Sequence, residues 1–339
     1  MNSSASAPPA LTGSVPTDRR LLFLAGNAAI DRTFEVEQVI AGSIHRPGTV
    51  LALPGGKGIN AARAAHTLGA NVTVVAVIAG HNGAWIAQHL ASEGIDRRLV
   101  PASGETRICT SVFDRSDGRL TEFYETGMAT EQSAWDEVLE VVDGEIKDAD
   151  LGAIICSGSV PPGSRNDLYA QVVRLGNGHR VPVFVDAAGP LLLEALNEHP
   201  AVVKVNREEA LTVSGVGDVN DRAAFDAANW LAAHGAVRAV VTLGVNGAIG
   251  VDRDSRTTFQ VEPVANPGRY SVGSGDAFMA GLALSTVMQE PFAEGLSLGM
   301  AAAIANASVQ GAGRFDPDEM ERLRPGVRVR QVAAAGPMD

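Results

Sequence analysis

The sequence predicts an α/β fold built on a large, mostly parallel sheet that helices cover on both faces. Two observations predict it. Short apolar runs alternate with helix-length amphipathic runs, and the apolar runs are continuous instead of alternating with polar residues. Continuous apolar strands separated by helices are typical of parallel sheets buried on both sides. With 339 residues, of which 45% are hydrophobic, the chain is long enough for one large core.

The expected elements follow from these runs in chain order. A stretch rich in Ser, Ala and Pro over residues 1–17 is expected to be a disordered tail, and the run LLFLAG (21–26) after it a buried first strand. Further strands are expected at 72–80, 151–158, 181–189, 201–206 and 239–244. Helices are expected at 60–69, 82–94, 165–178, 221–235, 277–288 and 291–313.

Two segments interrupt this rhythm, at residues 32–53 and 106–126. Both mix polar and apolar residues as strands do, neither has a helical pattern, and the second contains SDG, which favours a hairpin turn. We expect them to form a small β-sheet, inserted into the larger domain as a lid. The chain is then one domain over 18–330, followed by a loose tail over 331–339.

Composition and charge exclude several classes of function. The net charge of −12 argues against a nucleic-acid-binding protein, which normally carries a basic surface. No apolar run reaches the roughly 20 residues that a membrane-spanning helix needs. The two cysteines, Cys109 and Cys156, are too few for a disulfide framework, so we expect packed thiols in a cytoplasmic protein.

Polar residues recur where the expected strands end. They are Asn27, Asp31, Ser157, Ser159, Asp186, Asn206, Glu208, Glu209, Thr242 and Gly244. In open parallel sheets, ligands bind beyond the carboxyl ends of the strands, which all meet at one edge. The sequence therefore predicts a binding site at that edge.

Two glycine-rich turns precede helices, and each carries one charged residue. SVGSGDAF (271–278) contains Asp276, and bare N–H groups at a helix N-terminus suit an anion, although an ordinary capping acid is the alternative. PGGKGIN (54–60) is not a Walker A loop. It puts Lys57 at a helix start, where the helix dipole disfavours a cation unless an anion or a sugar oxygen joins it. A plain turn and helix start is the alternative there.

Six motifs stand in the order seen in ribokinase-like (PfkB-type) sugar kinases. They are NAAID (27–31), PGGKGIN (54–60), TRIC (106–109), SGSVPPG (157–163), NREE (206–209) and SVGSGDAFMAG (271–281). The chain resembles this family over residues 20–325, and most of all its phosphosugar branch. The resemblance implies a three-layer α/β/α core and a β-sheet lid that often also forms a dimer interface. It also implies ATP and Mg²⁺.

In this family the glycine turn before the helix is an anion hole, and its acid is the general base. By resemblance, Gly273, Ser274 and Gly275 would present N–H groups to the transferred phosphoryl group. Asp276 would accept the proton of the attacking hydroxyl. Phosphoryl transfer needs mainly positioning and charge stabilisation, so glycines and one carboxylate are chemically sufficient at this point.

The resemblance also assigns a nucleotide side to the site. Asn206 and Glu209 match an N-x-x-E motif associated with Mg²⁺ and phosphate through water, and Thr242 and Gly244 match a turn that lies along the nucleotide. Asn306 would approach the adenine. A helix capped by Asn206 and a polar group buried in a helix remain the alternatives for the first pair and for Asn306.

For the acceptor, the resemblance implies a carboxylate that binds sugar hydroxyls. Asp31 matches it, with Gly56, Lys57 and Asn60 beside it, and Ser159 would add a hydroxyl contact.

Arg46 and Arg107 match the arginines that hold the acceptor's phosphate in phosphosugar kinases. The planar guanidinium donates several hydrogen bonds to one phosphate group. Solvated arginines on lid strands are the alternative.

Departures from the family pattern limit these expectations. Cys109 stands where relatives have Asn, and Tyr270 stands where an Asp or Asn that helps to bind potassium is common, which argues against activation by a monovalent cation. The leading hypothesis is ATP-dependent phosphorylation of fructose 1-phosphate. Tagatose 6-phosphate, fructose 6-phosphate and an unphosphorylated sugar or nucleoside are alternative acceptors. A sugar or nucleotide sensor without catalysis is the alternative of another class, against which the intact Asp276 argues.

Overall fold

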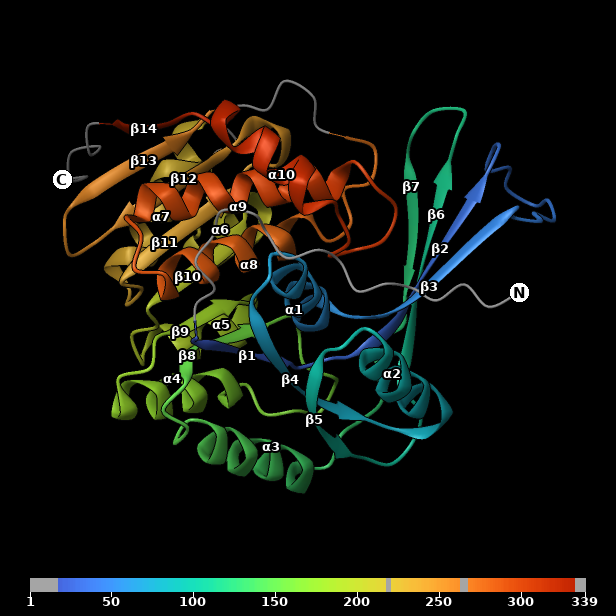
Figure 1. Ribbon diagram of the computed structural model, residues 1–339, viewed down its shortest axis with the longest axis horizontal. Helices are drawn as coiled ribbons and strands as arrows, with labels where there is room; N and C mark the ends of the chain where they lie inside the picture. The colour runs from blue at the N-terminus through green and yellow to red at the C-terminus, as the bar shows by residue number, and fades with distance from the viewer. Residues whose placement is uncertain (1–17, 218–220, 263–267, 333–339) are drawn as a thin grey trace.

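The structure, a computed structural model, describes residues 18–217, 221–262 and 268–332, so the tail expected over 1–17 lies outside it. Within the described residues the core is one ten-stranded sheet, in the order β14-β13-β12-β11-β10-β9-β8-β1-β4-β5 (Figure 1). The parallel strands are β1 (Arg20–Ala25), β4 (Asn71–Ile78), β5 (Asp96–Pro101), β8 (Leu151–Ser157), β9 (Val183–Asp186), β10 (Val202–Asn206) and β11 (Arg238–Thr242). Three antiparallel strands complete the sheet: β12 (Ala248–Asp252), β13 (Thr257–Val261) and β14 (Val329–Val332).

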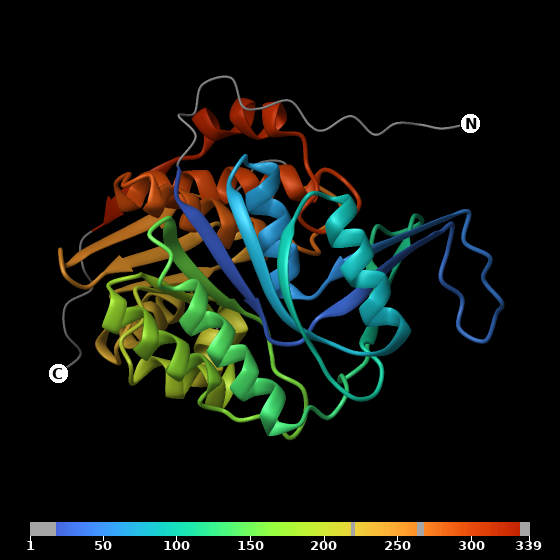
Figure 2. The same ribbon diagram turned by 60° about the horizontal axis from the view of Figure 1, so that its bottom comes forward.

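Helices cover both faces of this sheet, because successive residues of a strand point to opposite sides. The helices are α1 (Lys57–Thr67), α2 (Gly80–Ser92), α3 (Gln132–Glu145), α4 (Leu168–His179), α5 (Gly189–Leu196), α6 (Arg207–Ser214), α7 (Asp221–Ala233), α8 (Ser274–Val287), α9 (Phe292–Ala307) and α10 (Pro317–Leu323). Leu21 and Phe23 of β1 pack with α1, α2, α8 and α9, whereas Leu22 and Leu24 pack with α3, α4, α5 and α7. Figure 2 shows the sheet between the orange and red helices and the green ones. The expected three-layer fold is confirmed, and no helix of the described chain is both long and apolar enough to cross a membrane.

The sequence patterns do not predict α3, α5 or the antiparallel edge of the sheet. The turn between β12 and β13 spans only residues 253–256, which is long enough for a hairpin but too short for the crossover that a parallel pair needs. Strand β14 extends to Val332, so the first two residues of the expected loose tail pair with β13. Residues 333–339 lie outside the described chain.

A smaller sheet projects from one end of the core, in the order β3-β2-β6-β7 (Figure 1). Its strands are β2 (Ala29–Val36), β3 (Thr49–Gly55), β6 (Arg107–Asp114) and β7 (Leu120–Tyr124). β2 pairs parallel with β6, and the two outer strands pair antiparallel with them. The expected small β-sheet is therefore present, and we call it the lid sheet.

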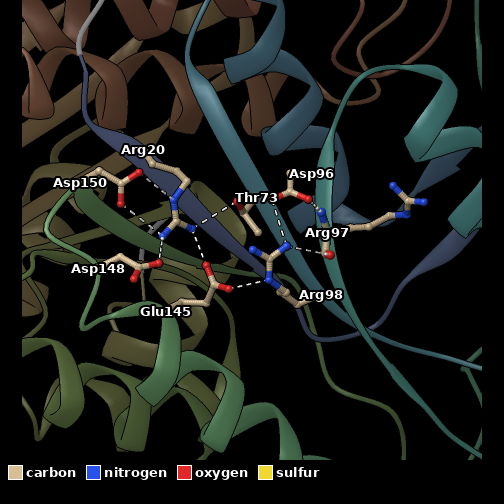
Figure 3. A network of polar contacts seen from close by, with 8 residues as sticks. All are labelled: Arg20, Thr73, Asp96, Arg97, Arg98, Glu145, Asp148 and Asp150. Atoms are coloured by element: carbon tan, nitrogen blue, oxygen red, sulfur yellow. Dashed lines mark hydrogen bonds and ion pairs between the residues drawn. The ribbon is translucent and has the colours of Figure 1, made fainter.

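A network of charged side chains joins the amino-terminal ends of the central strands to the end of α3 (Figure 3). Arg20 donates hydrogen bonds to Glu145 at 2.6 Å, to Thr73 at 3.2 Å and to Asp148 at 3.2 Å. Arg98 donates to the other carboxylate oxygen of Glu145, also at 2.6 Å. One carboxylate thus bridges two arginines on the side of the sheet opposite the strands' carboxyl ends.

We expect Glu145→Gln to lower the free energy of unfolding by about 2 kcal/mol, because it leaves the buried guanidinium of Arg20 with only exposed carboxylates. The Glu145 side chain is 10% exposed. Asp148→Asn is the control, since that side chain is 61% exposed and pairs of exposed charges contribute less than about 1 kcal/mol. Urea denaturation of both variants measures the difference, and equal losses would contradict a special role for Glu145.

Candidate active site

The polar residues that end the parallel strands lie along one edge of the sheet. Ser157 at the end of β8 is in register with Asp186 at the end of β9, and Asn206 at the end of β10 with Thr242 at the end of β11. The glycine-rich turns before α1 and α8 carry the other expected site residues. Carbonyl, hydroxyl, carboxylate and bare amide groups therefore gather at the edge where open parallel sheets bind ligands.

The turn before α8 is built around Gly273, which caps the helix with φ at 82°. A β-carbon there would lie 2.5 Å from the β-carbon of Ala312, so both the left-handed conformation and the close approach require glycine. The turn delivers Asp276 into the first helical turn of α8, where the side chain is buried.

Of the three N–H groups expected to be free in this turn, those of Gly273 and Gly275 have no acceptor among the described residues, whereas that of Ser274 has one. Ser274 donates its N–H to the carbonyl of Ser271 at 3.1 Å, so this group is not free to bind an anion. The N–H groups of Gly275 and Asp276 have no acceptor among the described residues, as is usual in the first turn of a helix. An anion at this helix end would meet those two donors.

Burial raises the pKa of the Asp276 carboxyl to about 7, and the negative charge of Asp186 raises it further. The positive charges of Lys204 and Lys57 oppose this shift. A carboxyl with a pKa near neutrality can accept a proton and release it again, which is the property that a general base needs.

Two lysines meet the buried carboxylate of Asp186. Lys57 donates to one of its oxygens at 3.2 Å and to Glu209 at 3.1 Å, and Lys204 forms an ion pair with the other oxygen. Lys204 also donates to the carbonyl of Gly275 at 3.2 Å. Burial disfavours the charged form of Asp186, but the two lysines outweigh it and hold the pKa of that carboxyl below its usual range. The carboxylates of Asp186 and Glu209 therefore balance the positive charge of Lys57, which the sequence places at a helix N-terminus.

Asn206 and Glu209 form a capping box at the start of α6. The Asn206 carboxamide accepts the N–H of Glu209 at 2.8 Å, and Glu209 accepts the N–H of Asn206 at 2.9 Å. The capping alternative is thus realised, while the second carboxylate oxygen of Glu209 faces Lys57. The described chain contains no group of three or more His, Cys, Asp and Glu side chains that could hold a metal ion. The site still offers the side-chain oxygens of Asn206 and Glu209. Such carboxylate and amide oxygens suit a Mg²⁺ ion that keeps several of its bound waters.

A hollow lies beside this turn, between the end of β11 and helices α8 and α9. Its lining includes Thr242, Gly244, Val245, Ser274, Gly275, Phe278, Met300 and Ile304. Thr242 and Gly244 thus lie next to the turn before α8. The apolar wall from α8 and α9 suits the flat face of a base, and the glycine turn suits its phosphates.

Asn306 does not line this hollow, which corrects the expected contact with adenine. It is fully buried, and its amide donates to the carbonyl of Val272 at 2.9 Å and to the hydroxyl of Ser274 at 3.2 Å. Its oxygen accepts the N–H of Gly313 at 2.8 Å. Asn306 therefore braces the glycine turn from behind.

On the other side of the turn, Asp31 lies against the second glycine-rich loop. Its carboxylate accepts the amide of Asn60 at 3.0 Å and the N–H of Gly56 at 3.4 Å. A β-carbon on Gly55 would lie 2.1 Å from the Asp31 carboxyl carbon, so only glycine fits there. Burial raises the pKa of Asp31, although both hydrogen bonds oppose the shift.

A cavity opens from Asp31 between the inner face of the lid sheet and the core. It is lined by Asp31, Thr33, Leu51, Leu53, Cys109, Ser111, Leu120, Tyr124, Tyr270, Val272, Gln310, Gly311 and Ala312. The period of two along the lid strands explains this set, since alternate residues share the inner face. The cavity offers hydroxyl, amide and carboxylate groups and no Lys or Arg from the described chain. Cys109 is a buried free thiol there, and burial raises its pKa to about 11.

Arg107 and Ser159 lie next to this cavity, around Asn27. Arg107 donates through its two terminal nitrogens to the backbone carbonyls of Glu125 at 3.0 Å and Asn27 at 2.9 Å. Its Nε atom is buried without a hydrogen-bond partner among the described residues. The Ser159 hydroxyl accepts the Asn27 amide at 3.4 Å. An unpaired buried donor is costly, so a ligand oxygen at this Nε would stabilise the arrangement.

Within one chain, Arg46 does not lie near Asp31 or Arg107. It is exposed, in the loop beyond the β2–β3 pair Glu35–Thr49, whereas Asp31 pairs with Leu53 at the other end of the two strands. It lines a polar hollow at the tip of the lid sheet. The loop lies at the end of the sheet away from the core in Figure 1.

Sequence reasoning missed two buried cations of the site, Lys204 and Arg63. Lys204 lies between valines in β10, and Arg63 lies in a helix rich in alanine. A charge in a buried element is a signal, because such a group needs a partner. Neither partner could be named before the chain was folded.

The chain matches known proteins over most of its length. The family model for pfkB family carbohydrate kinases matches residues 19–319. A tagatose-6-phosphate kinase of Staphylococcus epidermidis is 27% identical over 327 residues, which cover 92% of this chain and all of that protein. A 1-phosphofructokinase of Rhodobacter capsulatus is 29% identical over 298 residues, covering 86% of this chain and 90% of that protein. Among solved structures, the tetrameric inhibited form of phosphofructokinase-2 from Escherichia coli superposes with a TM-score of 0.81 at 25% identity, covering 91% of this chain and 98% of that one.

Proposed function

Because the chain belongs to the pfkB family of carbohydrate kinases, we propose that it transfers the γ-phosphoryl group of ATP to a hydroxyl of a ketohexose phosphate. Fructose 1-phosphate, which would become fructose 1,6-bisphosphate, is the acceptor that we propose first. The observation that carries the proposal is the buried Asp276, at a helix end with two free N–H groups. On one side of it lies the hollow beside α8 and α9, and on the other the cavity at Asp31.

In the proposed reaction, the acceptor oxygen attacks the γ-phosphorus as its proton passes to the Asp276 carboxylate. The bond from the γ-phosphorus to the bridging oxygen breaks, and ADP leaves with that electron pair. The N–H groups of Gly275 and Asp276 would stabilise charge on the transferred group, and Lys57 would balance charge beside it. Asp31 and Asn60 would hold the acceptor's hydroxyls.

Magnesium would enter with the nucleotide and neutralise phosphate charge. Glu209 and Asn206 would hold the ion through its waters, because both side chains are committed to the α6 cap and only part of each is available. Thr242 and Gly244 would lie along the nucleotide. Chelation of Mg²⁺ is expected to abolish turnover.

Two observations support a phosphorylated acceptor. The curated relatives named above act on sugar phosphates, and the unpaired Nε of Arg107 offers a donor beside Ser159 and the acceptor cavity. One observation favours a second candidate, a kinase of an unphosphorylated sugar or nucleoside. The residues that line the cavity include no Lys or Arg, and Thr33, Ser111, Tyr124 and Gln310 are neutral hydrogen-bonding partners.

A panel of acceptors separates these candidates. Rates with ATP are measured for fructose 1-phosphate, fructose 6-phosphate, tagatose 6-phosphate, ribose and adenosine, each with and without added potassium. The proposal predicts the highest kcat/KM for fructose 1-phosphate and no effect of potassium. A preference for free ribose or adenosine over every sugar phosphate would contradict it and support the second candidate.

We also propose that two copies dimerise through the outer face of the lid sheet. Apolar side chains gather there: Val50 is 56% exposed and Phe123 64% exposed, and the strand register puts Phe34 and Val112 in the row of Val50, on the same face as Phe123. Exposed apolar side chains on a projecting sheet favour association. The solved phosphofructokinase-2 neighbour is described as tetrameric, so a larger assembly is an alternative outcome.

Phe123→Glu is expected to convert the dimer into a monomer, because it introduces a charge among the exposed apolar side chains of the proposed contact. Light scattering after size exclusion measures the mass of each form. Glu122→Gln is the control, since Glu122 precedes Phe123 in β7 and lies on the inner face, where it accepts hydrogen bonds from Ser111 and Tyr124. A wild-type monomer, or a Phe123→Glu variant with unchanged mass, would contradict dimerisation through this face.

A further inference from the structure

Arg63 is buried in α1, and all of its hydrogen-bond donors are used. Nε donates to Glu93 at 2.7 Å, and Nη2 donates to Glu93 at 3.3 Å and to the carbonyl of Pro54 at 2.6 Å. Nη1 donates to the carboxamide oxygen of Asn60 at 3.3 Å and to the carbonyl of Ala312 at 3.2 Å. These five contacts match the five N–H groups of a guanidinium.

On the acceptor side, Arg63 fixes the orientation of Asn60. A carboxamide has one acceptor end and one donor end. Because Arg63 binds the oxygen of Asn60, the amide nitrogen turns toward Asp31, to which it donates at 3.0 Å. The bond to Pro54 also holds the start of the glycine loop whose Gly56 N–H faces Asp31.

On the anion-hole side, Arg63 anchors the loop that packs against the turn before α8. Its contact with Ala312 holds that loop on α1, where Thr67 also binds the carbonyl of Gly313. Ala312 leaves no room for a β-carbon on Gly273. The next residue, Gly313, binds Asn306, which in turn donates to Ser274.

We propose that Arg63 is a positioning residue that fixes the Asp31 carboxylate relative to the glycine turn before Asp276. Arg63 acts on Asp31 through Asn60 and on the glycine turn through Ala312, and its own side chain is not proposed to touch either substrate. Its catalytic consequence rests on the proposed function, since phosphoryl transfer requires the acceptor hydroxyl and the phosphoryl group to be held about 3–3.5 Å apart. Lysine, with a point charge and three donors, cannot reproduce the five contacts.

A variant of Glu93 serves as the control that distinguishes a positioning role of Arg63 from a purely structural one. Glu93→Gln weakens the ion pair with Arg63 but leaves the bonds to Asn60, Ala312 and Pro54 in place. Arg63→Lys keeps a positive charge near Glu93 and loses the bonds to the two sides of the site. The two variants are compared with the wild type at matched thermal stability, by choosing the temperature of each measurement. If Arg63→Lys does not fold, Arg63→Gln takes its place.

The first readout is backbone hydrogen exchange in the ligand-free protein. The proposal predicts faster exchange in peptides covering both 54–60 and 271–277 for Arg63→Lys, and wild-type exchange there for Glu93→Gln. Exchange that is unchanged in either peptide, or equally raised by both variants, would overturn it.

The second readout is kinetic, with ATP and fructose 1-phosphate. Arg63→Lys is expected to lower kcat/KM for the acceptor by about 100-fold relative to Glu93→Gln, with the Kd for ATP unchanged. Equal kinetics in the two variants would also overturn the proposal. A wild type that phosphorylates no acceptor refutes the proposed function instead, and hydrogen exchange then still decides whether Arg63 links the two sides.

Discussion

Asp276→Asn is expected to lower kcat by about 10²–10⁴-fold while ATP and the sugar phosphate still bind. The substitution keeps the size of the side chain and removes its ability to accept the acceptor's proton. The side chain is buried at the start of α8, where the first turn offers free N–H groups. Steady-state rates and binding of each substrate to the variant measure the two effects separately.

The same variant is expected to be more stable than the wild type at pH 8. The pKa of Asp276 is raised from 3.8 to about 7 in the folded state, chiefly by burial. Between these two values the unfolded chain carries the charge and the folded chain does not, so the wild type loses stability as the pH rises. The loss is complete above about pH 7, and on the order of 4 kcal/mol is expected from a shift of about three pKa units. Asn lacks this titration, so the difference in Tm should grow from about pH 4 to 7 and then level off.

Glu294→Gln is the matched control for Asp276→Asn. Glu294 is also an acid in the first turn of a neighbouring helix, α9, but it is 56% exposed. It should change neither kcat nor the pH dependence of Tm. If Asp276→Asn retains turnover, Asp276 is not the base. If the wild type binds both substrates without turnover, the protein is a sensor.

Lys204→Met is expected to shift the acidic limb of the pH–rate profile to higher pH. Lys204 lowers the pKa of Asp276, so its removal raises that pKa, and a base acts only when it is ionised. The rate at pH 7 should fall and recover in part toward about pH 9. The free energy of unfolding should also drop by about 3 kcal/mol, because the fully buried Asp186 keeps only Lys57 as a partner.

The pH dependence of kcat/KM and urea denaturation test both effects of Lys204→Met. Lys147→Met is the control, since that lysine is 60% exposed and follows the end of α3, where it pairs with Asp143. It should leave the pH dependence of kcat/KM unchanged. It should lower the free energy of unfolding by less than about 1 kcal/mol, which is the contribution of an exposed ion pair. An unchanged acidic limb in Lys204→Met would contradict the electrostatic link between Lys204 and Asp276.

The sequence predicted the sheet, the lid sheet and the two glycine turns because these depend on local pattern. Continuous apolar runs report burial on both faces, and glycine reports a conformation or an approach that other residues do not tolerate. Gly273 and Gly55 illustrate this, since an added β-carbon would lie 2.5 Å from Ala312 at the first position and 2.1 Å from Asp31 at the second.

What the sequence did not predict depends on partners far away in the chain. Lys204 and Asp186, and Arg63 and Ala312, meet only after folding. Asn306 was expected at the adenine from the family resemblance, but its orientation is set by the carbonyl of Val272 and the N–H of Gly313. Arg46 matched an arginine of the family motif, and that match alone did not show that Arg46 lies beyond the far end of the β2–β3 pair.

The most direct test is a crystal structure of the wild type with Mg²⁺, a non-hydrolysable ATP analogue and fructose 1-phosphate. We expect the γ-phosphate at the N–H groups of Gly275 and Asp276. An acceptor hydroxyl should lie within about 3.2 Å of the Asp276 carboxylate. A γ-phosphate bound elsewhere, or an Asp276 carboxylate that faces solvent away from both ligands, would contradict the proposed chemistry.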